Sequence, residues 1–152
     1  MAADAGLTAV VDRLIDLFNR QSLDLPDGLF TRHTQFRLNG VAFEEMLGRS
    51  PTDPLVLMLA RGPAGYRFTA KAVQHAITGA ALQRGELSET ASGDRRLLTG
   101  QCWLSGTFRG THDPADVLVD IALTLRGSAV ERADASIDPQ VLERIREARL
   151  RP

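Results

Sequence analysis

The chain shows two hydrophobic periodicities, first that of helices and then that of strands. This order is the feature that most constrains its fold. Apolar residues recur at helical spacing near the start, whereas the part from Tyr66 to Ile137 consists of strand-like runs separated by short turns. Helices followed by sequential hairpins indicate an α+β domain rather than alternating βαβ units. With 152 residues, the whole chain is expected to form a single domain with a substantial core.

The first 65 residues are predicted to be rich in helix. Apolar residues between Leu7 and Phe18 fall on one side of a helical projection, with charged residues on the other, which predicts an amphipathic helix of about four turns. Asn39-Gly40 predicts a turn. The other elements expected here are a short helix or turn, a strand and two helices, at 26–30, 34–38, 42–47 and 55–61.

The sheet is predicted to occupy residues 66–137. Its strand-like runs are 66–77, 81–89, 96–108, 117–126 and 129–137. The turns between them are expected at Thr78-Gly79, Ser92-Gly93-Asp94, Gly110 to Pro114 and Gly127-Ser128. Asp138-Pro139 then begins a C-terminal helix at 138–150, which completes the expected domain.

The run 117–126 is apolar on both faces, which predicts a strand that is covered on both sides. One face carries a continuous β-branched and leucine stripe of Val117, Val119, Ile121, Leu123 and Leu125. Burial under helices and burial against a second subunit both explain such a stripe. We expect a homodimer that uses the sheet face with Val119, Ile121 and Leu123.

Composition and charge exclude several classes of partner. The 18 basic and 19 acidic residues are scattered along the chain without a basic stripe, which argues against nucleic acid. The longest strongly apolar run, 55–60, is too short to span a membrane. Cys102 is the single cysteine, and the first residues lack the basic region of a secretory signal. A reducing, cytoplasmic location is therefore expected.

Residues 7–40 resemble the opening of ketosteroid isomerases and other NTF2-like domains. The matching positions, in register without a gap, are Thr8, Ala9, Val10, Val11, Arg13, Asn19, Leu23, Asp24 and Phe30. The segment 118–138 resembles the last two strands of that family, whereas the helix from Asp138 is an addition. The resemblance implies an NTF2-like cone, in which N-terminal helices pack on a curved, mostly antiparallel sheet around a small apolar pocket.

The resemblance also implies that the isomerase chemistry is lost. The family's tyrosine on the first helix corresponds to Leu14, and its general base on the first strand corresponds to Leu38. Its protonated carboxylic acid on a late strand corresponds to Asp120. Because a leucine can neither donate nor move a proton, ketosteroid isomerase activity is not expected.

Asp120 is the candidate polar group of the predicted pocket. It is the only charge in 117–124, and an isolated buried carboxylate is costly unless a partner or ligand satisfies it. It would bind a ligand carbonyl or act as an acid or base, or else it is paired with an arginine or exposed at a sheet rim. The residues predicted to line the pocket are Leu14, Phe18, Phe36, Leu38, Trp103, Leu118, Asp120 and Ala122.

Three functions remain open from the sequence. The first is a binding domain for a small apolar or carbonyl-containing organic molecule. The second is a SnoaL-like enzyme for proton transfer, cyclisation or epoxide opening, with Asp120 catalytic and His75 or Gln101 assisting. The third is a non-catalytic dimerisation module. No cofactor is expected, because the histidines lack metal-ligand spacing and the glycines form no phosphate-binding pattern.

Overall fold

The computed structural model describes residues 5–46, 58 and 60–149, and it confirms the α+β prediction. The elements are α1 (Ala5–Asn19), β1 (Phe30–Leu38), β2 (Val41–Ala42), α2 (Phe43–Met46), α4 (Pro63–Ala76), β3 (Ile77–Ser92), β4 (Arg95–Phe108), β5 (Pro114–Arg126), β6 (Ala129–Ser136) and α5 (Pro139–Arg149). Most of the helix expected at 55–61 lies outside the described residues. The expected helix or turn at 26–30 is a turn.

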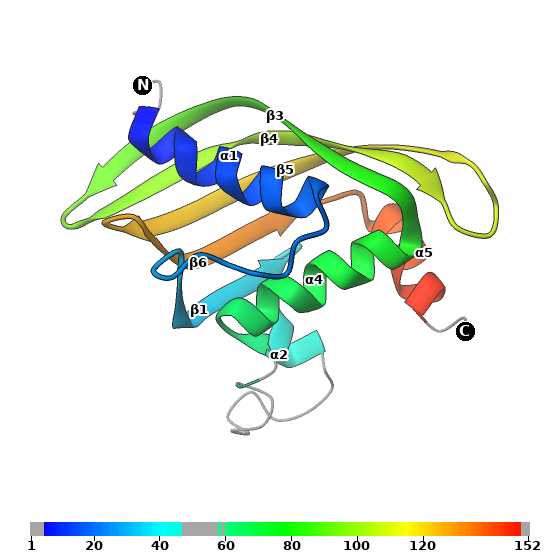
Figure 1. The fold of residues 1–152 in the computed structure, drawn as a ribbon, viewed down its shortest axis with the longest axis horizontal. Coiled ribbons are helices and arrows are strands. Elements are labelled where there is room, and N and C mark those ends of the chain that lie inside the picture. The colour runs from blue at the N-terminus through cyan, green and yellow to red at the C-terminus, as the bar shows by residue number, and fades with distance from the viewer. Residues whose placement is uncertain (1–4, 47–57, 59, 150–152) are drawn as a thin grey trace.

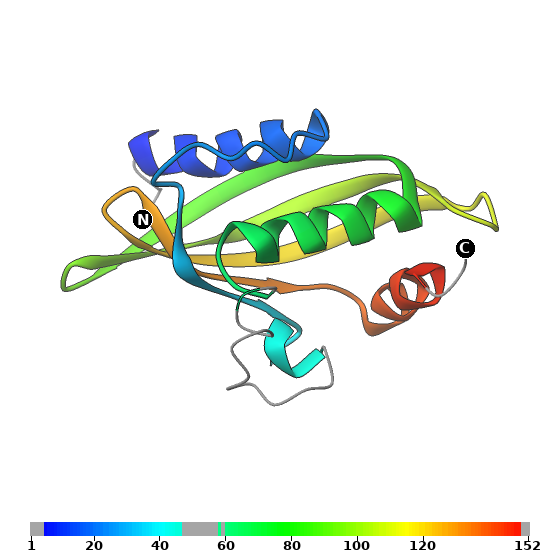
Figure 2. The same cartoon turned by 60° about the horizontal axis from the view of Figure 1, so that its bottom comes forward.

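The strands form one curved sheet in the order β2-β1-β6-β5-β4-β3 (Figures 1 and 2). Strands β3 to β6 follow each other as antiparallel neighbours, and β6 then lies parallel to β1. Both long helices, α1 and α4, lie on the same side of the sheet (Figure 2). The sheet therefore has an inner face toward these helices and an outer face away from them.

Residues Pro63–Ala76 form helix α4, so the strand predicted at 66–77 is wrong. The aromatic and β-branched residues of this segment suggested a strand, because such residues favour strands. However, Tyr66, Ala70, Val73 and Ile77 recur at intervals of four, three and four, which places them on one side of a helix. Pro63 at the first helical turn supports the same start. The run of antiparallel strands that follows α4 begins at Ile77, eleven residues after the predicted start at Tyr66.

The turn predicted at Thr78-Gly79 is a bulge inside the continuous strand β3. Thr78 already pairs with Thr107 on β4, and the register shifts between Thr78 and Ala81. Gly79 has a φ of 68°, a left-handed conformation that glycine adopts without a steric penalty. The C-terminal helix is confirmed, and the carboxylate of Asp138 accepts a hydrogen bond from the backbone N–H of Gln140 at its start.

Helix α5 packs against α4 on the inner side of the sheet. Its buried residues Ile145 and Ala148 join a core cluster that also contains Phe18 of α1. Polar contacts also hold α5 in place. The His75 ring meets the carbonyl of Ala148 at 3.1 Å, and the Arg144 guanidinium lies 3.7 Å from the centre of the Phe108 ring. None of the described helices is long and apolar enough to cross a membrane.

Two asparagine side chains form the pair of backbone hydrogen bonds that a neighbouring strand would otherwise form. The Asn19 amide donates to the carbonyl of Leu82 at 3.0 Å and accepts from the N–H of Leu82 at 2.7 Å, on the free edge of β3. The Asn39 amide makes the same two bonds with Ile137, at 3.0 and 2.8 Å. Each amide thereby satisfies one donor and one acceptor of a backbone that no neighbouring strand reaches.

Candidate functional site

Tyr66 is the polar side chain that α4 turns toward the inner face of the sheet. It packs against two core clusters, one containing Phe18 and the other containing Phe36. Its ring centre lies 5.9 Å from that of Phe30. Tyr66 is therefore a partly buried residue at the junction between helix α4, helix α1 and strand β1.

The hydroxyl of Tyr66 is buried and has no hydrogen-bond partner among the described residues. By contrast, the fully buried Thr34 donates its hydroxyl hydrogen to the carbonyl of Val130. Nε of Arg37 is the other buried side-chain atom that lacks a hydrogen-bond partner among the described residues. A buried hydroxyl without a partner destabilises the protein by about 1–3 kcal/mol relative to one that is hydrogen-bonded. Such groups are rare in folded proteins, so the hydroxyl of Tyr66 needs a structural or functional explanation.

Burial raises the pKa of Tyr66 above its ordinary value of 10.0, because the phenolate is poorly solvated there. We expect the absorbance near 295 nm to titrate with a midpoint above 10, and Tyr66 is the single tyrosine, so the signal is unambiguous. The folded state holds the phenol proton of Tyr66 more tightly than the unfolded state does. The contribution of this proton to the free energy of unfolding is therefore complete below pH 10, and it is lost as the pH rises through the folded pKa. A midpoint at or below 10 would contradict the buried position.

Tyr66 lies at one end of a row of aromatic rings that continues from Phe30. The ring of Phe36 is tilted against Phe30 at 5.5 Å and stacks on Phe43 at 5.7 Å, and Phe43 meets Phe68 at 6.1 Å. No charged side chain is fully buried among the described residues. The surroundings of the hydroxyl are therefore apolar and aromatic, a setting that suits flat, uncharged molecules.

Four of the residues predicted to line the pocket do lie on the inner side. Leu14 packs into the core cluster of α1, Phe18 is buried below α4, and Phe36 and Leu38 share the aromatic cluster of β1. The structure brings Phe18, Phe36 and Leu38 into the clusters that Tyr66 touches, and these are the predicted residues nearest to the candidate site.

The other four predicted residues lie on the outer face. Asp120 and Trp103 are exposed, and each pairs across strands β4 and β5, Asp120 with Gln101 and Trp103 with Leu118. Ala122 has the same parity as Asp120 along β5, so its side chain is on that face too. The Asp120 carboxylate accepts a hydrogen bond from the Gln101 amide at 3.0 Å. The prediction that Asp120 lines an inner pocket with Leu14 and Leu38 is therefore wrong.

The homodimer face predicted from Val119, Ile121 and Leu123 is also wrong. Leu123 is buried in a core cluster under the helices, and Ile121 and Val119 pack against the two clusters on the same side. The apolar stripe of β5 is therefore buried under helices. This was one of the two explanations that the sequence left open, the other being burial against a second subunit. These side chains are not available to a second subunit.

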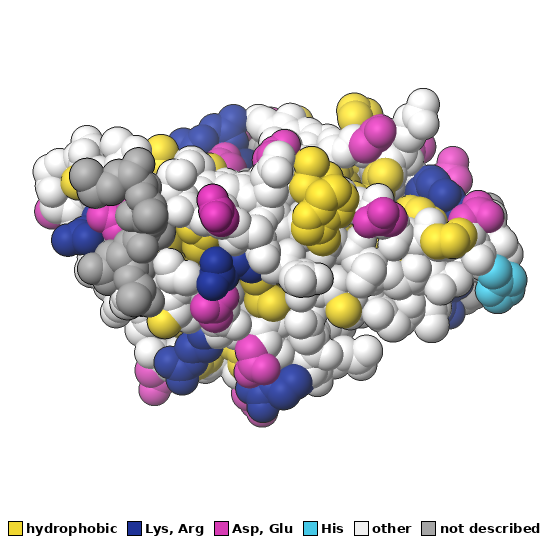
Figure 3. All heavy atoms as spheres, turned by 90° about the horizontal axis from the view of Figure 1, so that it is seen from above, with side chains coloured by type: hydrophobic (Ala, Val, Ile, Leu, Met, Phe, Trp, Pro, Cys, Tyr) yellow, Lys and Arg dark blue, Asp and Glu magenta, His cyan; other side chains and the backbone are white. Residues whose placement is uncertain are grey.

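An open hollow of about 540 Å³ lies between α1 and the free edge of β3. Its lining residues are Asp12, Ile15, Leu82, Gln83, Arg84, Gly85 and Glu86. The Arg84 guanidinium pairs with the Asp12 carboxylate at 2.5 Å inside it, so its main charges already neutralise each other. From above, the surface shows only separate apolar patches among polar and charged side chains (Figure 3).

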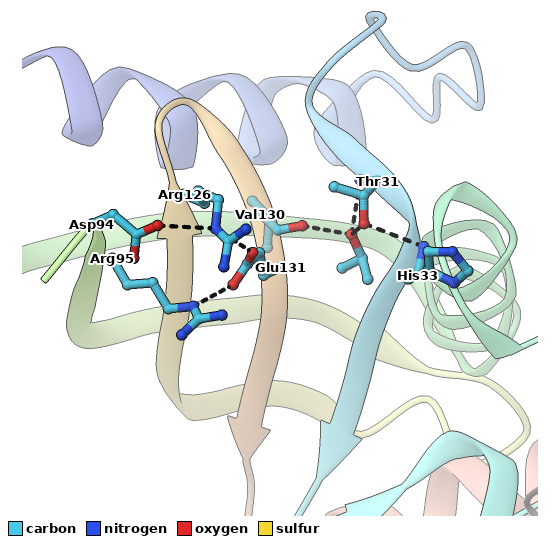
Figure 4. Close-up of polar contacts among 8 residues, drawn as sticks. Thr31, His33, Asp94, Arg95, Arg126, Val130 and Glu131 are labelled. Carbon is cyan, nitrogen blue, oxygen red and sulfur yellow. Dashed lines mark hydrogen bonds and ion pairs between the residues drawn. The ribbon is translucent and has the colours of Figure 1, made fainter. Parts of the chain in front are cut away.

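A second hollow, of about 290 Å³, lies beside β1 and is lined by Thr31, His33, Gln35, Arg61 and Glu131. Its carboxylate is already engaged, because Glu131 accepts from Arg95 at 2.8 Å and from Arg126 at 2.9 Å (Figure 4). The described residues contain no cluster of three His, Cys, Asp or Glu that would hold a metal ion. Neither hollow contains Tyr66, and the choice of Tyr66 as the candidate site rests on its buried hydroxyl without a partner.

Sequence reasoning missed Tyr66 because it assigned that residue to a strand. The signal that identifies it is the helical spacing of Tyr66 with Ala70 and Val73, which places the phenol on the side of α4 that faces the core. Cys102 is buried, and this burial raises the pKa of its thiol, so it packs as a small apolar residue.

No protein-family model and no curated protein matches this sequence. Among solved structures, a putative SnoaL-like polyketide cyclase from Jannaschia sp. CCS1 matches with a TM-score of 0.60 at 15% identity, over 92% of this chain and 90% of that one. A protein of ketosteroid isomerase-like fold from Catenulispora acidiphila, in complex with trimethylamine, gives 0.54 at 11%, over 83% and 82%. TerC, co-crystallised with polyporic acid, gives 0.61 at 12%, over 94% and 99%.

Proposed function

Because the chain has the NTF2-like fold, we propose that it is a binding domain for a small organic molecule held between the helices and the inner face of the sheet. The observation that carries the proposal is the buried hydroxyl of Tyr66, which has no partner among the described residues. Two proteins of similar structure were crystallised with small organic molecules, trimethylamine and polyporic acid, which supports this use of the fold.

The ligand should be uncharged, largely apolar and equipped with a hydrogen-bond acceptor. Tyr66 is protonated near neutral pH, because the ordinary pKa of a tyrosine is 10.0 and burial raises it further, so its hydroxyl can act as a donor. A carbonyl oxygen is the simplest acceptor for it. A charged ligand would lose its hydration without a buried counterion among the described residues, which is strongly unfavourable. Carbonyl-containing aromatic and polycyclic compounds fit these requirements.

The proposed function does not include ketosteroid isomerase activity. Leu14 and Leu38 both pack in inner clusters, and neither side chain can exchange a proton. The enzyme alternative that relied on Asp120 loses its support, because that carboxylate faces away from the interior toward Gln101. Ligand binding at Tyr66 is thus proposed without an acid or base drawn from those three positions.

The substitution Tyr66→Phe tests the site, because it should raise the stability of the unliganded protein and lower its affinity for the ligand. Removing a buried, unpaired hydroxyl should raise the free energy of unfolding of the unliganded protein by about 1 kcal/mol. The same substitution should weaken a carbonyl ligand about tenfold, because its hydrogen bond is lost. The ligands come from a thermal-shift screen of steroids, polyketides, terpenes and aromatic acids, and the dissociation constants are measured by calorimetry.

Thr69→Val is the matched control, because it removes a hydroxyl from the same helix that already has a partner, the carbonyl of Gly65 at 3.0 Å. This variant should keep the wild-type ligand affinity. Binding that is equally strong in the wild type and in Tyr66→Phe would contradict the proposal, and so would a screen in which no compound stabilises the protein.

The homodimer and the cytoplasmic location also remain proposals. A single buried cysteine, Cys102, suits a reducing compartment. The inner stripe is covered by helices, so we propose that the two copies pair through another surface.

A further inference from the structure

The hydroxyl of Tyr66 is closed off from solvent in this structure. It is buried, and neither of the two described hollows contains Tyr66. A molecule that binds this hydroxyl must therefore displace part of the surrounding structure before it arrives. The described elements differ in how firmly they are held, so their contacts indicate which of them moves at the lowest cost.

Helices α4 and α1 are both tied to the sheet. The backbone N–H of Gly62, at the start of α4, donates to the carbonyl of Thr34 on β1 at 2.9 Å. At the other end of α4, the carbonyl of Ala76 accepts from the backbone N–H of Arg109 at 2.9 Å. Helix α1 is joined to β3 by the two amide bonds of Asn19. Moving either helix would break backbone hydrogen bonds that no other group replaces.

Helix α5 is held less firmly than α1 and α4. It lies beside α4, beyond the end of β6 (Figures 1 and 2). Among the described residues it makes no backbone hydrogen bond to another element. Its fully buried side chains within the described range are Ile145 and Ala148. Little apolar surface therefore has to be exposed when α5 leaves its place.

The polar contacts of α5 with other elements come from two places. The Arg144 guanidinium donates to the hydroxyl of Thr111 at 2.7 Å and to the carboxylate of Asp113 at 3.2 Å, and it lies over the Phe108 ring. The carbonyl of Ala148 meets the His75 ring, as described above. The side chains of Arg144 and Asp113 are 36% and 61% exposed, so water competes for this ion pair and weakens it.

The start of α5 is built like a hinge. The carboxylate of Asp138 caps the helix through the N–H of Gln140 at 2.8 Å, whereas the preceding residue, Ile137, is held to Asn39 by two hydrogen bonds. A rotation about the N–Cα bond of Asp138 would therefore move the helix together with its cap and leave the end of β6 in place.

We propose that helix α5 is the gate of the Tyr66 site, an inference that rests on the proposed function. Tyr66 packs against the same core cluster to which α5 contributes Ile145 and Ala148. When α5 swings away about Asp138, this cluster is opened beside α4, and an uncharged molecule can pass along apolar side chains toward the hydroxyl. When α5 docks again, it excludes water from the bound molecule.

The single tyrosine of the chain allows a test without any ligand. Tetranitromethane nitrates a phenol ring that it can reach, and the absorbance of nitrotyrosine then reports on Tyr66 alone. We expect the wild-type protein to be nitrated slowly, at a rate set by the opening of α5. Because this opening exposes little surface, the rate should hardly change in low urea, whereas a rate set by global unfolding would rise steeply.

Two substitutions on α5 should accelerate the nitration of Tyr66. Arg144→Gln removes the contacts of α5 with β4 and the turn after it, and should raise the rate at least about fivefold. Ile145→Ala removes a buried side chain and should raise it at least about tenfold. The matched control is Arg146→Gln, because Arg146 pairs with Glu143 of the same helix. This variant should be nitrated at the wild-type rate.

The compounds that bind in the thermal-shift screen provide a second readout. Arg144→Gln should raise their association and dissociation rate constants by the same factor and leave the dissociation constant unchanged, because a gate alters access and not the contacts of the bound molecule. Tyr66→Phe, by contrast, should raise the dissociation constant. Stopped-flow mixing measures the two rate constants.

The outcomes separate the gate from the proposed function. Equal nitration rates in the wild type, Arg144→Gln and Ile145→Ala would overturn the gate, and ligand binding at Tyr66 would still be judged by calorimetry. The gate would also be overturned if Leu98→Ala, a change in the other core cluster of α1, accelerated nitration as much as Ile145→Ala does, because global unfolding would then admit the reagent. Acceleration in Arg144→Gln but not in Arg146→Gln supports control of access by α5 even if no screened compound binds.

Discussion

Leu98→Ala should lower the free energy of unfolding by about 3 kcal/mol. Leu98 is completely buried and belongs to the core cluster that joins α1 to strands β4 and β5, where it lies opposite Leu123. Removing its branched end loses the transfer free energy of the deleted carbons and leaves a cavity that the packed neighbours fill only in part. Urea denaturation with a linear extrapolation measures the change.

The neighbouring Leu97→Ala is the control for this prediction. The two leucines are adjacent on β4 and undergo the same chemical change, but Leu97 is 38% exposed on the outer face. Its substitution should alter the stability of the monomer by no more than about 0.5 kcal/mol. Titrations at two protein concentrations separate any contribution of the proposed dimer, because only association depends on concentration. Equal losses for both variants would contradict the assignment of inner and outer faces.

Gly65→Ala should destabilise the protein by about 2 kcal/mol or more, although alanine is the better helix former. Gly65 lies in the first turns of α4 and is buried against β1. A Cβ atom at this position would overlap the ring of Phe36 and would lie 2.5 Å from the backbone carbonyl oxygen of Ala60. Helix α4 would have to move away from the sheet. Thermal and urea denaturation measure the loss.

The double variant Gly65→Ala with Phe36→Leu tests the cause of that loss. The smaller side chain removes the ring that the new methyl group meets, so the double variant should lose less stability than the sum of the two single variants. Strict additivity would show that the ring is not the obstacle. A stability gain in Gly65→Ala alone would contradict the close approach of α4 to β1, and with it the placement of Tyr66.

The periodicity of the sequence predicts most of the sheet. The turns at Ser92 to Asp94 and at Gly127-Ser128, and the parity of the stripe in β5, are confirmed because alternation and turn residues are local signals. Helix α4 was missed because Phe68, Thr69 and Val73 carry strand preferences that tertiary packing overrides. Propensity describes single residues, whereas the contact with the sheet decides the segment.

The candidate site could be predicted less well than the fold. Side chains alternate between the two faces of a strand, so if Val119 and Ile121 point inward, Asp120 must point outward. The family resemblance predicted the opposite, namely that Asp120 lines an inner pocket. The alternation was right. Tyr66 is recognisable only once α4 is placed, because the lack of a hydrogen-bond partner is a property of three-dimensional packing and not of sequence spacing.

The side-chain amides of Asn19 and Asn39 make this fold sensitive to chemical ageing. Each amide supplies both a donor and an acceptor to a strand end, at Leu82 and at Ile137. Spontaneous hydrolysis of either amide to a carboxylate would keep the acceptor and turn the donor into a second negative oxygen facing a carbonyl. Asn39 precedes Gly40, the neighbour that hinders this reaction least. Long storage at alkaline pH should therefore loosen first the junction between β6 and α5.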